Sequence, residues 1–347
     1  MVAAQRQEDS SDPDEGIPIL ALRPSSMNDA SSWRTMELRL MYHYATVVCH
    51  VMPNCDGAPT HAWQRVIPQR SFTSEMVLNS LLALSALHIH AHSPHDTSTR
   101  MALSRYLDRS FVYHREAVSR CNRLSEELWL SAVIISHISW LLVRQPLPDQ
   151  PYELPLQALK ILRGIGGVFT RESVFLRQLG YNSFTYDTLP YTADINDLSL
   201  AAQENMKSIE EDFKDLFEGF DTSSLTAGDL DIYIEAKDYV LHQYRAFYSG
   251  ESVGTLRRFV VTMVARIQPA YHGLLEKHDP LAMAIMARMM IILRVLGYAW
   301  WVNGQGEYEV VERDIHGILG LMPKHLRWAM DWPCRVLNGD IILNVDR

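Results

Sequence analysis

Four histidines stand close together at the end of one strongly apolar segment of the chain. They follow the run MVLNSLLALSA and are His88, His90, His92 and His95. His88 and His92 are one helical turn apart, so their imidazoles could bind the same metal ion. Histidines are also typical of a helix C-terminus, where the helix dipole favours positive charge. We favour the helix-terminus interpretation and keep the metal as the alternative.

A second segment has the outline of a motif that binds magnesium. Glu211, Asp212 and Asp215 resemble the D-D-x-x-D motif with which class I terpene cyclases hold Mg²⁺ through carboxylate oxygens. Apolar residues recur at helical spacing from Ile209 to Phe220, which predicts that Glu211 and Asp215 face solvent. The second motif of those enzymes, N-D-x-x-S-x-x-x-E, is absent from the sequence. We therefore expect no metal, and Mg²⁺ at these three carboxylates is the alternative.

Two arginines interrupt the most apolar segment, which runs from Asp279 to Trp301. Arg288 and Arg294 are six positions apart and so lie on different faces of a helix. A buried arginine needs an acid or an anionic ligand, because an isolated buried charge is very costly. Pairing with a carboxylate from another helix is the favoured interpretation, and binding of a ligand's phosphate or carboxylate is the alternative.

Methionines and tryptophans are concentrated in the same segment. Methionine fills irregular space and adapts to varied apolar ligands, so this composition favours a deformable apolar pocket as well as ordinary core packing. We predict that a hydrophobic ligand binds at four residues of this segment: Met286, Met290, Arg294 and Trp301.

The elements that position these residues are predicted to be helical. From Trp33 onward apolar residues recur every three or four positions, and no useful alternating run indicates a sheet. The sequence predicts an all-α fold, a single orthogonal bundle of about ten helices around an apolar core, over residues 34–347. Residues 1–33 are rich in Ser, Asp, Glu and Pro, which predicts a disordered acidic leader.

Charge and cysteine usage narrow the class of protein. Among 347 residues, 41 acids outnumber 32 bases, which gives a net charge of −9 and argues against direct nucleic-acid binding. The four cysteines, Cys49, Cys55, Cys121 and Cys334, are scattered and indicate neither a zinc cluster nor a disulfide framework. We expect an intracellular protein, in the nucleus or the cytoplasm.

Two apolar stretches are long enough to raise the question of a membrane span. Residues 128–143 are too few to cross a bilayer, and residues 284–302 contain two arginines near their middle, which would be costly in hydrocarbon. We expect both to be core helices, and no membrane span.

Blocks of residues along the chain resemble, in order, the C-terminal effector region of fungal Zn2Cys6 transcription factors, and most closely the sterol uptake control proteins. The likeness covers about residues 36–338. Its blocks include Met36-Glu37-Leu38, His43-Tyr44, Trp63, Ile67-Pro68-Gln69, Leu81 to His88, His114 with Ala117, Leu162 to Ile165, Asp279-Pro280-Leu281-Ala282, Trp300-Trp301, Trp328 and Trp332-Pro333. The resemblance implies an all-helical effector domain with a ligand pocket.

Two departures from that family bear on function. The family carries a six-cysteine zinc cluster and a basic linker ahead of this region, whereas only about 35 residues, acidic in balance, precede the first helix here. We therefore expect an effector domain without its own DNA-reading module. Arg294 also stands where relatives often have histidine.

Two functions follow from these observations. The first is a transcription-regulator-like, ligand-sensing domain linked to fungal sterol or secondary-metabolite control. It would bind a hydrophobic small molecule or a protein partner but no nucleic acid, as a homodimer or a heterodimer, and without a cofactor. The alternative is an enzyme of fungal secondary metabolism with the same fold, such as a non-canonical Mg²⁺-dependent terpene cyclase. The sequence leaves open whether the chain is an enzyme.

Overall fold

The computed structural model describes residues 30–53, 62–120, 125–144, 151–179, 189–222, 225–304 and 310–343. All regular structure in these ranges is helical, which confirms the all-α prediction. Residues 1–29 of the predicted leader lie outside the described residues. The last four residues assigned to the leader, 30–33, already belong to the first helix.

The N-terminal helices are built around α4. In chain order they are α1 (Ala30–His43), the π-helical turn η1 (Tyr44–Val48), α2 (Cys49–Val51), the π-helical turn η2 (Ala62–Val66), α3 (Ile67–Ser71), α4 (Glu75–His92), α5 (Thr97–Arg120) and α6 (Glu126–Arg144). The Ser74 hydroxyl caps α4 by accepting from the amide of Val77. Because α4 is apolar nearly all round, it is covered by α1, α3, α5 and α6.

Three serines connect the helices of this N-terminal half inside the core. The Ser80 hydroxyl of α4 lies 2.6 Å from that of Ser110 on α5 and 3.0 Å from that of Ser131 on α6. All three are fully buried. Mutual hydrogen bonding removes the cost of burying these polar groups, which is why an apolar core tolerates them.

The C-terminal half surrounds α14. The remaining elements are α7 (Leu156–Arg171), α8 (Ser173–Gln178), η4 (Ile195–Asp197), α9 (Leu200–Gly219), α10 (Ala227–Tyr248), α11 (Val253–Val261), α12 (Met263–Arg266), α13 (Pro269–Glu276), α14 (Pro280–Val295), α15 (Trp300–Asn303), α16 (Val310–Leu321), η6 (Lys324–Met330) and α17 (Asp331–Leu337). Helices α10, α11, α13, α16 and α17 pack around α14.

The described helical segments are more numerous than the ten predicted, because several long helices are broken. One such stretch, residues 253–276, is divided into α11, α12 and α13. The Thr262 hydroxyl donates to the carbonyl of Arg258 at 2.7 Å, which competes with the helical pattern at the first break. Pro269 lacks a backbone N–H, so α13 begins at that residue.

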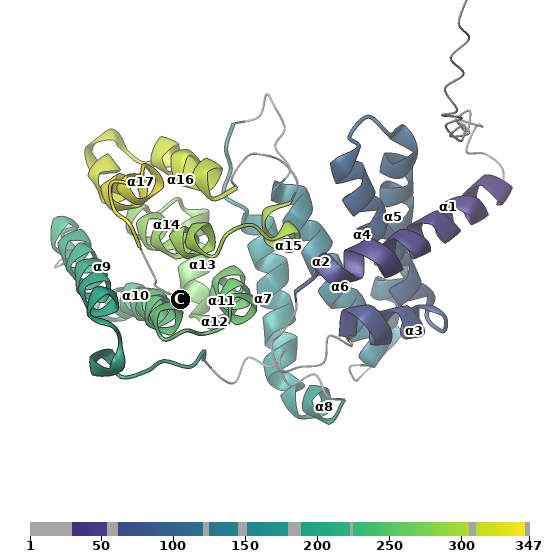
Figure 1. Ribbon diagram of the computed structural model, residues 1–347, viewed down its shortest axis with the longest axis horizontal. Coiled ribbons are helices and arrows are strands. Elements are labelled where there is room, and N and C mark those ends of the chain that lie inside the picture. Colours follow the sequence, from purple (N-terminus) through teal and green to yellow (C-terminus); the bar gives the residue numbers. More distant parts are fainter. Residues whose placement is uncertain are drawn as a thin grey trace, which may run out of the picture.

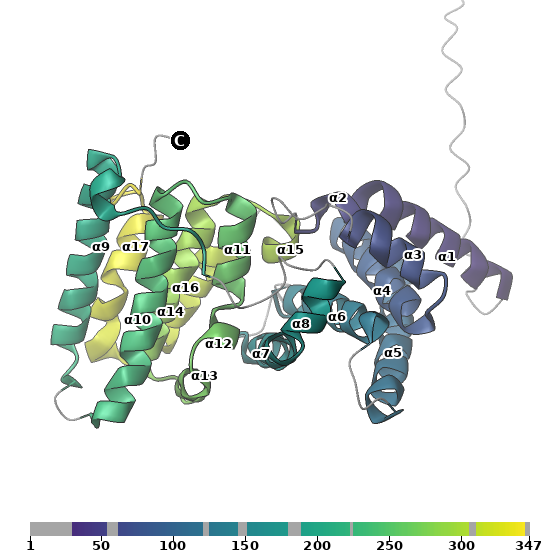
Figure 2. The same cartoon turned by 90° about the horizontal axis from the view of Figure 1, so that it is seen from below.

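The two groups of helices lie side by side and share one core. Figures 1 and 2 show α1 to α6 on one side and α9 to α14, α16 and α17 on the other, with α7 and α15 between them. Helix α7 packs on α6 and α12, and α15 packs on α6. The buried apolar residues form one cluster that runs from α1 to the residues after α17.

Helix α6 is the described helix whose length and composition would allow it to cross a membrane. Within the 18-residue window Glu126–Val143, 61% is buried inside the molecule. Its neighbours are α4, α5, α7 and α15. This packing supports the prediction that the stretch is a core helix.

Two glycines of α16 provide a matched test of this packing. A Cβ atom added at Gly317 would lie 2.2 Å from the ring of Tyr152, whereas one added at Gly320 would meet open space. We expect Gly317→Ala to lower the free energy of unfolding by about 1–3 kcal/mol through overpacking. Gly320→Ala should leave it unchanged or raise it by up to about 1 kcal/mol, because alanine is the better helix former. Urea unfolding measures both, and equal effects would contradict the packing.

Candidate functional site

Helix α14 begins where the sequence predicts and is buried along most of its length. The Asp279 carboxylate accepts from the amide of Ala282 at 2.9 Å, and Pro280 occupies the first turn. Every residue from Leu281 to Leu293 is buried. Any charge in this stretch must therefore find its partner inside the protein.

Arg288 is the charged residue within that buried stretch, and it pairs with α9. Its Nε and Nη2 donate to Oδ2 and Oδ1 of Asp212 at 2.6 and 2.8 Å, which is a bidentate ion pair. The Arg288 side chain is 3% exposed and that of Asp212 is 15% exposed. The favoured interpretation, pairing with a carboxylate from another helix, is confirmed for this arginine.

The remaining contacts of Arg288 join further elements. Its Nη1 donates to the carbonyls of Ala284 at 3.1 Å and Ala329 at 2.9 Å. The Tyr244 hydroxyl donates to the Arg288 carbonyl at 2.7 Å, and burial raises the pKa of that hydroxyl well above its usual value. Arg288 thus connects α9, α10, α14 and η6, and its guanidinium group donates its hydrogen bonds to groups of the protein itself.

The three carboxylates of the alternative magnesium site, Glu211, Asp212 and Asp215, do not point toward one another in this arrangement. Asp212 points into the core toward Arg288, whereas Glu211 and Asp215 are exposed on the outer side of α9. Glu211 lies 3.8 Å from Lys207, as expected of a solvated helix face. No group of three His, Cys, Asp or Glu side chains in the described ranges is arranged to hold a metal ion. The D-D-x-x-D outline is therefore a structural ion pair with two surface acids beside it.

Three of the four predicted ligand-binding residues share one face of α14. Met286, Met290 and Arg294 follow one another at intervals of four residues. Each methionine is two positions from Arg288, or about 200° around the helix, so this face is opposite the ion pair. Met286 and Met290 are 3% and 4% exposed, and Arg294 is exposed near the end of the helix.

The fourth predicted residue, Trp301, lies on α15 and faces the N-terminal half. Its ring centroid is 5.9 Å from that of His137 on α6. The neighbouring Trp300 ring is 4.5 Å from the ring of His88, and the Trp140 indole N–H donates to the Val302 carbonyl at 2.9 Å. The structure therefore places Trp301 between the two halves, on an element adjacent in sequence to the α14 face.

The histidines at the end of α4 take part in this contact. His88 is 4% exposed, its Nδ1 lies 3.1 Å from Nε2 of His43, and its ring stacks on that of His92 at 4.4 Å. We call His43, His88, His137, Trp300 and Trp301 the α15 joint. Sequence reasoning did not connect His43 and His137 with His88, because each is the only histidine of its helix and only the fold brings them near α15.

Burial keeps the histidines of the α15 joint neutral. Desolvation lowers the pKa of His88 to about 3, with His92 and His43 adding to the shift, and lowers that of His137 to about 4. The His137 Nδ1 donates to the Val133 carbonyl at 2.8 Å, so Nε2 is the unprotonated nitrogen. A neutral imidazole packs against indole rings without the cost of burying a charge.

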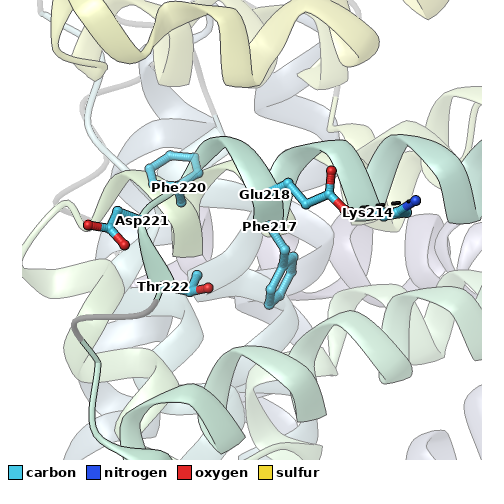
Figure 3. Close-up of a pocket in the computed structure, with 6 residues that line it drawn as sticks. All are labelled: Lys214, Phe217, Glu218, Phe220, Asp221 and Thr222. Atoms are coloured by element: carbon cyan, nitrogen blue, oxygen red, sulfur yellow. Dashed lines mark ion pairs between the residues drawn. The ribbon is translucent and has the colours of Figure 1, made fainter.

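A hollow lies at the end of α9, away from these residues. It has a volume of about 360 Å³, is open to solvent, and is lined by Lys214, Phe217, Glu218, Phe220, Asp221 and Thr222 (Figure 3). Lys214 and Glu218 lie 3.8 Å apart at its edge. Its lining contains none of the four predicted ligand-binding residues.

Comparison with known proteins defines the class of domain. Residues 39–141 match the fungal specific transcription factor domain, which is similar in sequence to this part of the chain. The matched range extends from α1 to α6 and contains His43, His88 and His137. The resemblance found in the sequence is confirmed, and the family implies an intracellular protein.

Three similar proteins support this assignment. A Zn(2)-C6 fungal-type transcription factor of Gibberella zeae is 23% identical over 89% of this chain and 63% of its own length. The Zn(2)-C6 fungal-type transcription factor afumD of Aspergillus fumigatus is 23% identical over 47% of this chain and 44% of its own. Sterol uptake control protein 2 of Candida albicans is 27% identical over 42% of this chain and 20% of its own. The chain thus spans less than two thirds of each relative.

The buried ion pair leads to a prediction about stability. Asp212→Ala leaves the Arg288 charge buried and unpaired, so we expect the free energy of unfolding to fall by about 3–5 kcal/mol. Asp215→Ala, three residues further along the same helix but exposed, should change it by less than about 0.5 kcal/mol. Chemical denaturation measures both. A small effect at Asp212 would show that the pair does not hold α9 in place.

The depressed histidine pKa values predict an acid-sensitive fold. Unfolded His88 and His137 take up protons near pH 6.5, but the folded protein resists this until about pH 3 and 4. The contribution of these two histidines to the free energy of unfolding is therefore fully present above about pH 6.5 and is lost as the pH falls below that value. We expect the denaturation midpoint to decline from pH 7 to 5, and less steeply in His137→Phe than in the surface control His316→Phe. Identical slopes in both variants would contradict the burial of His137.

Proposed function

We propose that this chain is the effector domain of a fungal transcriptional regulator that responds to a hydrophobic small molecule. The molecule would lie on the α14 face formed by Met286, Met290 and Arg294, next to Trp301. Occupancy would be passed through α15 to the matched transcription factor domain. The observation that carries the proposal is the position of α15, which begins five residues after α14 ends and packs into the N-terminal half.

The order of residues along α14 suggests the kind of ligand. Two buried methionines are followed, one turn further, by an exposed cation. An elongated apolar molecule with a polar or anionic end fits this order, because its body gains from burial and its end reaches Arg294 in partial contact with water. Trp301 supplies an aromatic surface beside it.

The effect of ligand binding would be transmitted to the α15 joint through side-chain packing. Trp300 and Trp301 contact His88 and His137, which belong to helices of the matched domain. A tightly packed interior is not continuously deformable, so displacement of α15 would alter the contact between the two halves. Such coupling through a two-state element is what a ligand-sensing domain requires.

The relatives support a proposal about the regulatory context. One similar protein is named for control of sterol uptake, and the other two are Zn(2)-C6 factors. We propose that this chain acts in the nucleus in sterol or secondary-metabolite control. With a net charge of −9, it would act through a DNA-bound protein partner or as a dimer with a complete factor rather than through its own contacts with DNA. The divergent directions of Glu211, Asp212 and Asp215 disfavour the terpene cyclase alternative.

The ligand proposal is tested with protein isolated from a fungal host. We expect native mass spectrometry to show a bound lipid-like molecule on the wild-type chain. Met290→Phe, which fills the proposed face, should raise the dissociation constant about tenfold, equivalent to about 1.4 kcal/mol of binding, and so lower the bound fraction. The control Met289→Phe is equally buried but lies on another side of α14, so it should retain the ligand. An empty wild-type chain, or equal loss in both variants, would overturn the proposal.

A further inference from the structure

Helix α1 has one face in the core and one apolar face in solvent. Its inner residues, Met36 and Leu40, pack against α4, and the Leu40 carbonyl accepts from the Ser85 hydroxyl at 2.7 Å. On the outer side, Leu38 is 68% exposed and Tyr42 is 72% exposed. Figure 1 shows α1 at the edge of the molecule, and the exposure of Leu38 and Tyr42 shows that the other described helices leave this face uncovered.

The exposed residues form a continuous stripe along the helix and its extension η1. We call it the α1 stripe, and it consists of Thr35, Leu38, Tyr42, Ala45 and Thr46, all exposed. The spacing of three and four residues is that of a helix seam that packs against another segment. The two threonine hydroxyls donate to carbonyls of their own turn, Thr35 to Ser31 at 3.1 Å and Thr46 to Tyr42 at 2.8 Å. A segment that binds the stripe therefore does not need polar groups to satisfy these two hydroxyls.

Charge at the edges of the stripe selects among occupants. Arg34 and Arg39 are exposed beside it, and the Arg39 side chain remains 52% exposed although it lies 3.8 Å from Asp96. The acid on α1, Glu37, is partly buried and accepts from the Tyr106 hydroxyl at 3.3 Å. A second copy of α1 would bring the same two arginines and no exposed acid. The stripe therefore favours an apolar segment with negative charge.

The chain contains such a segment immediately before α1. Five acids, Glu8, Asp9, Asp12, Asp14 and Glu15, precede the apolar run from Ile17 to Leu22. Seven residues separate Leu22 from Ala30, the first residue of α1. Seven extended residues reach up to about 25 Å, and the fourteen residues of α1 rise about 21 Å. The linker is therefore long enough to bring the run to any point of the stripe.

We propose that residues 8–22 dock back onto the α1 stripe of the same molecule. The apolar run covers Leu38 and Tyr42, and the acids lie beside Arg34 and Arg39. The stripe overlaps the start of the matched transcription factor domain at residue 39, so the docked segment covers one surface of that domain. This contact is intramolecular and does not depend on the ligand proposed above.

Photo-crosslinking of the full chain tests the docking. A benzoylphenylalanine in place of Tyr42 should crosslink within the same molecule to residues 17–22, as mapped by mass spectrometry. The same probe in place of Leu200, which is 78% exposed at the start of α9 on the far side of the molecule, should not reach that segment. Crosslinks to a second copy that rise with protein concentration, or no crosslinks from Tyr42, would overturn the proposal.

A charge variant separates specific docking from chance encounters. Replacing all five acids of residues 8–15 by Asn or Gln removes the negative charge without touching the described residues. We expect the Tyr42 crosslink to fall at least about threefold, and about 1 M salt to have a similar effect, because the Debye length is then near 3 Å. Circular dichroism confirms that the variant remains folded. A yield unchanged by both treatments would rule out the charge-directed docking proposed here.

Discussion

The arrangement of the C-terminal half depends on one buried charge. Helix α14 is enclosed on all sides, and Arg288 in its middle must be neutralised inside the protein. The bidentate bond to Asp212 and the donated bonds to Ala284 and Ala329 meet that demand. Because this geometry is specific, the pair sets how α9 and η6 lie on α14. The same contacts turn Met286 and Met290 to the opposite side of the helix.

A second constraint is the contact between the two halves through α15. This helix has only four residues, and both of its tryptophans are buried. Trp300 meets His88, Trp301 meets His137, and the Trp140 indole bonds to the backbone of Val302. The histidines occupy aromatic positions as neutral rings, and these contacts join the N-terminal helices to the C-terminal half in one core.

Sequence reasoning located several chemically active groups but did not identify the partner of Asp212 and misjudged the burial of His88. Glu211, Asp212 and Asp215 have the spacing of metal ligands, yet on a helix neighbouring positions diverge by about 100°. One of the three enters the core and two stay in water. The four histidines near His88 indicated a solvated helix end. His88 is instead buried, because Trp300, more than 200 residues away in the sequence, packs against its ring. In both cases a partner distant in sequence decides the role of the residue.

Local patterns were sufficient for the helical class, the start of α14 at Asp279-Pro280, the burial of its apolar stretch and the need of Arg288 for an acid. These follow from short-range chemistry: helical periodicity, capping and the cost of an unpaired charge. The sequence also showed the family resemblance, through apolar blocks kept in order. Only the tertiary structure decided that Asp212 is the acid, that α15 joins the halves at His88 and His137, and that one face of α1 is left in solvent. Each of these is a contact between residues far apart in the chain, and periodicity says which side of a helix is apolar but not what lies against it.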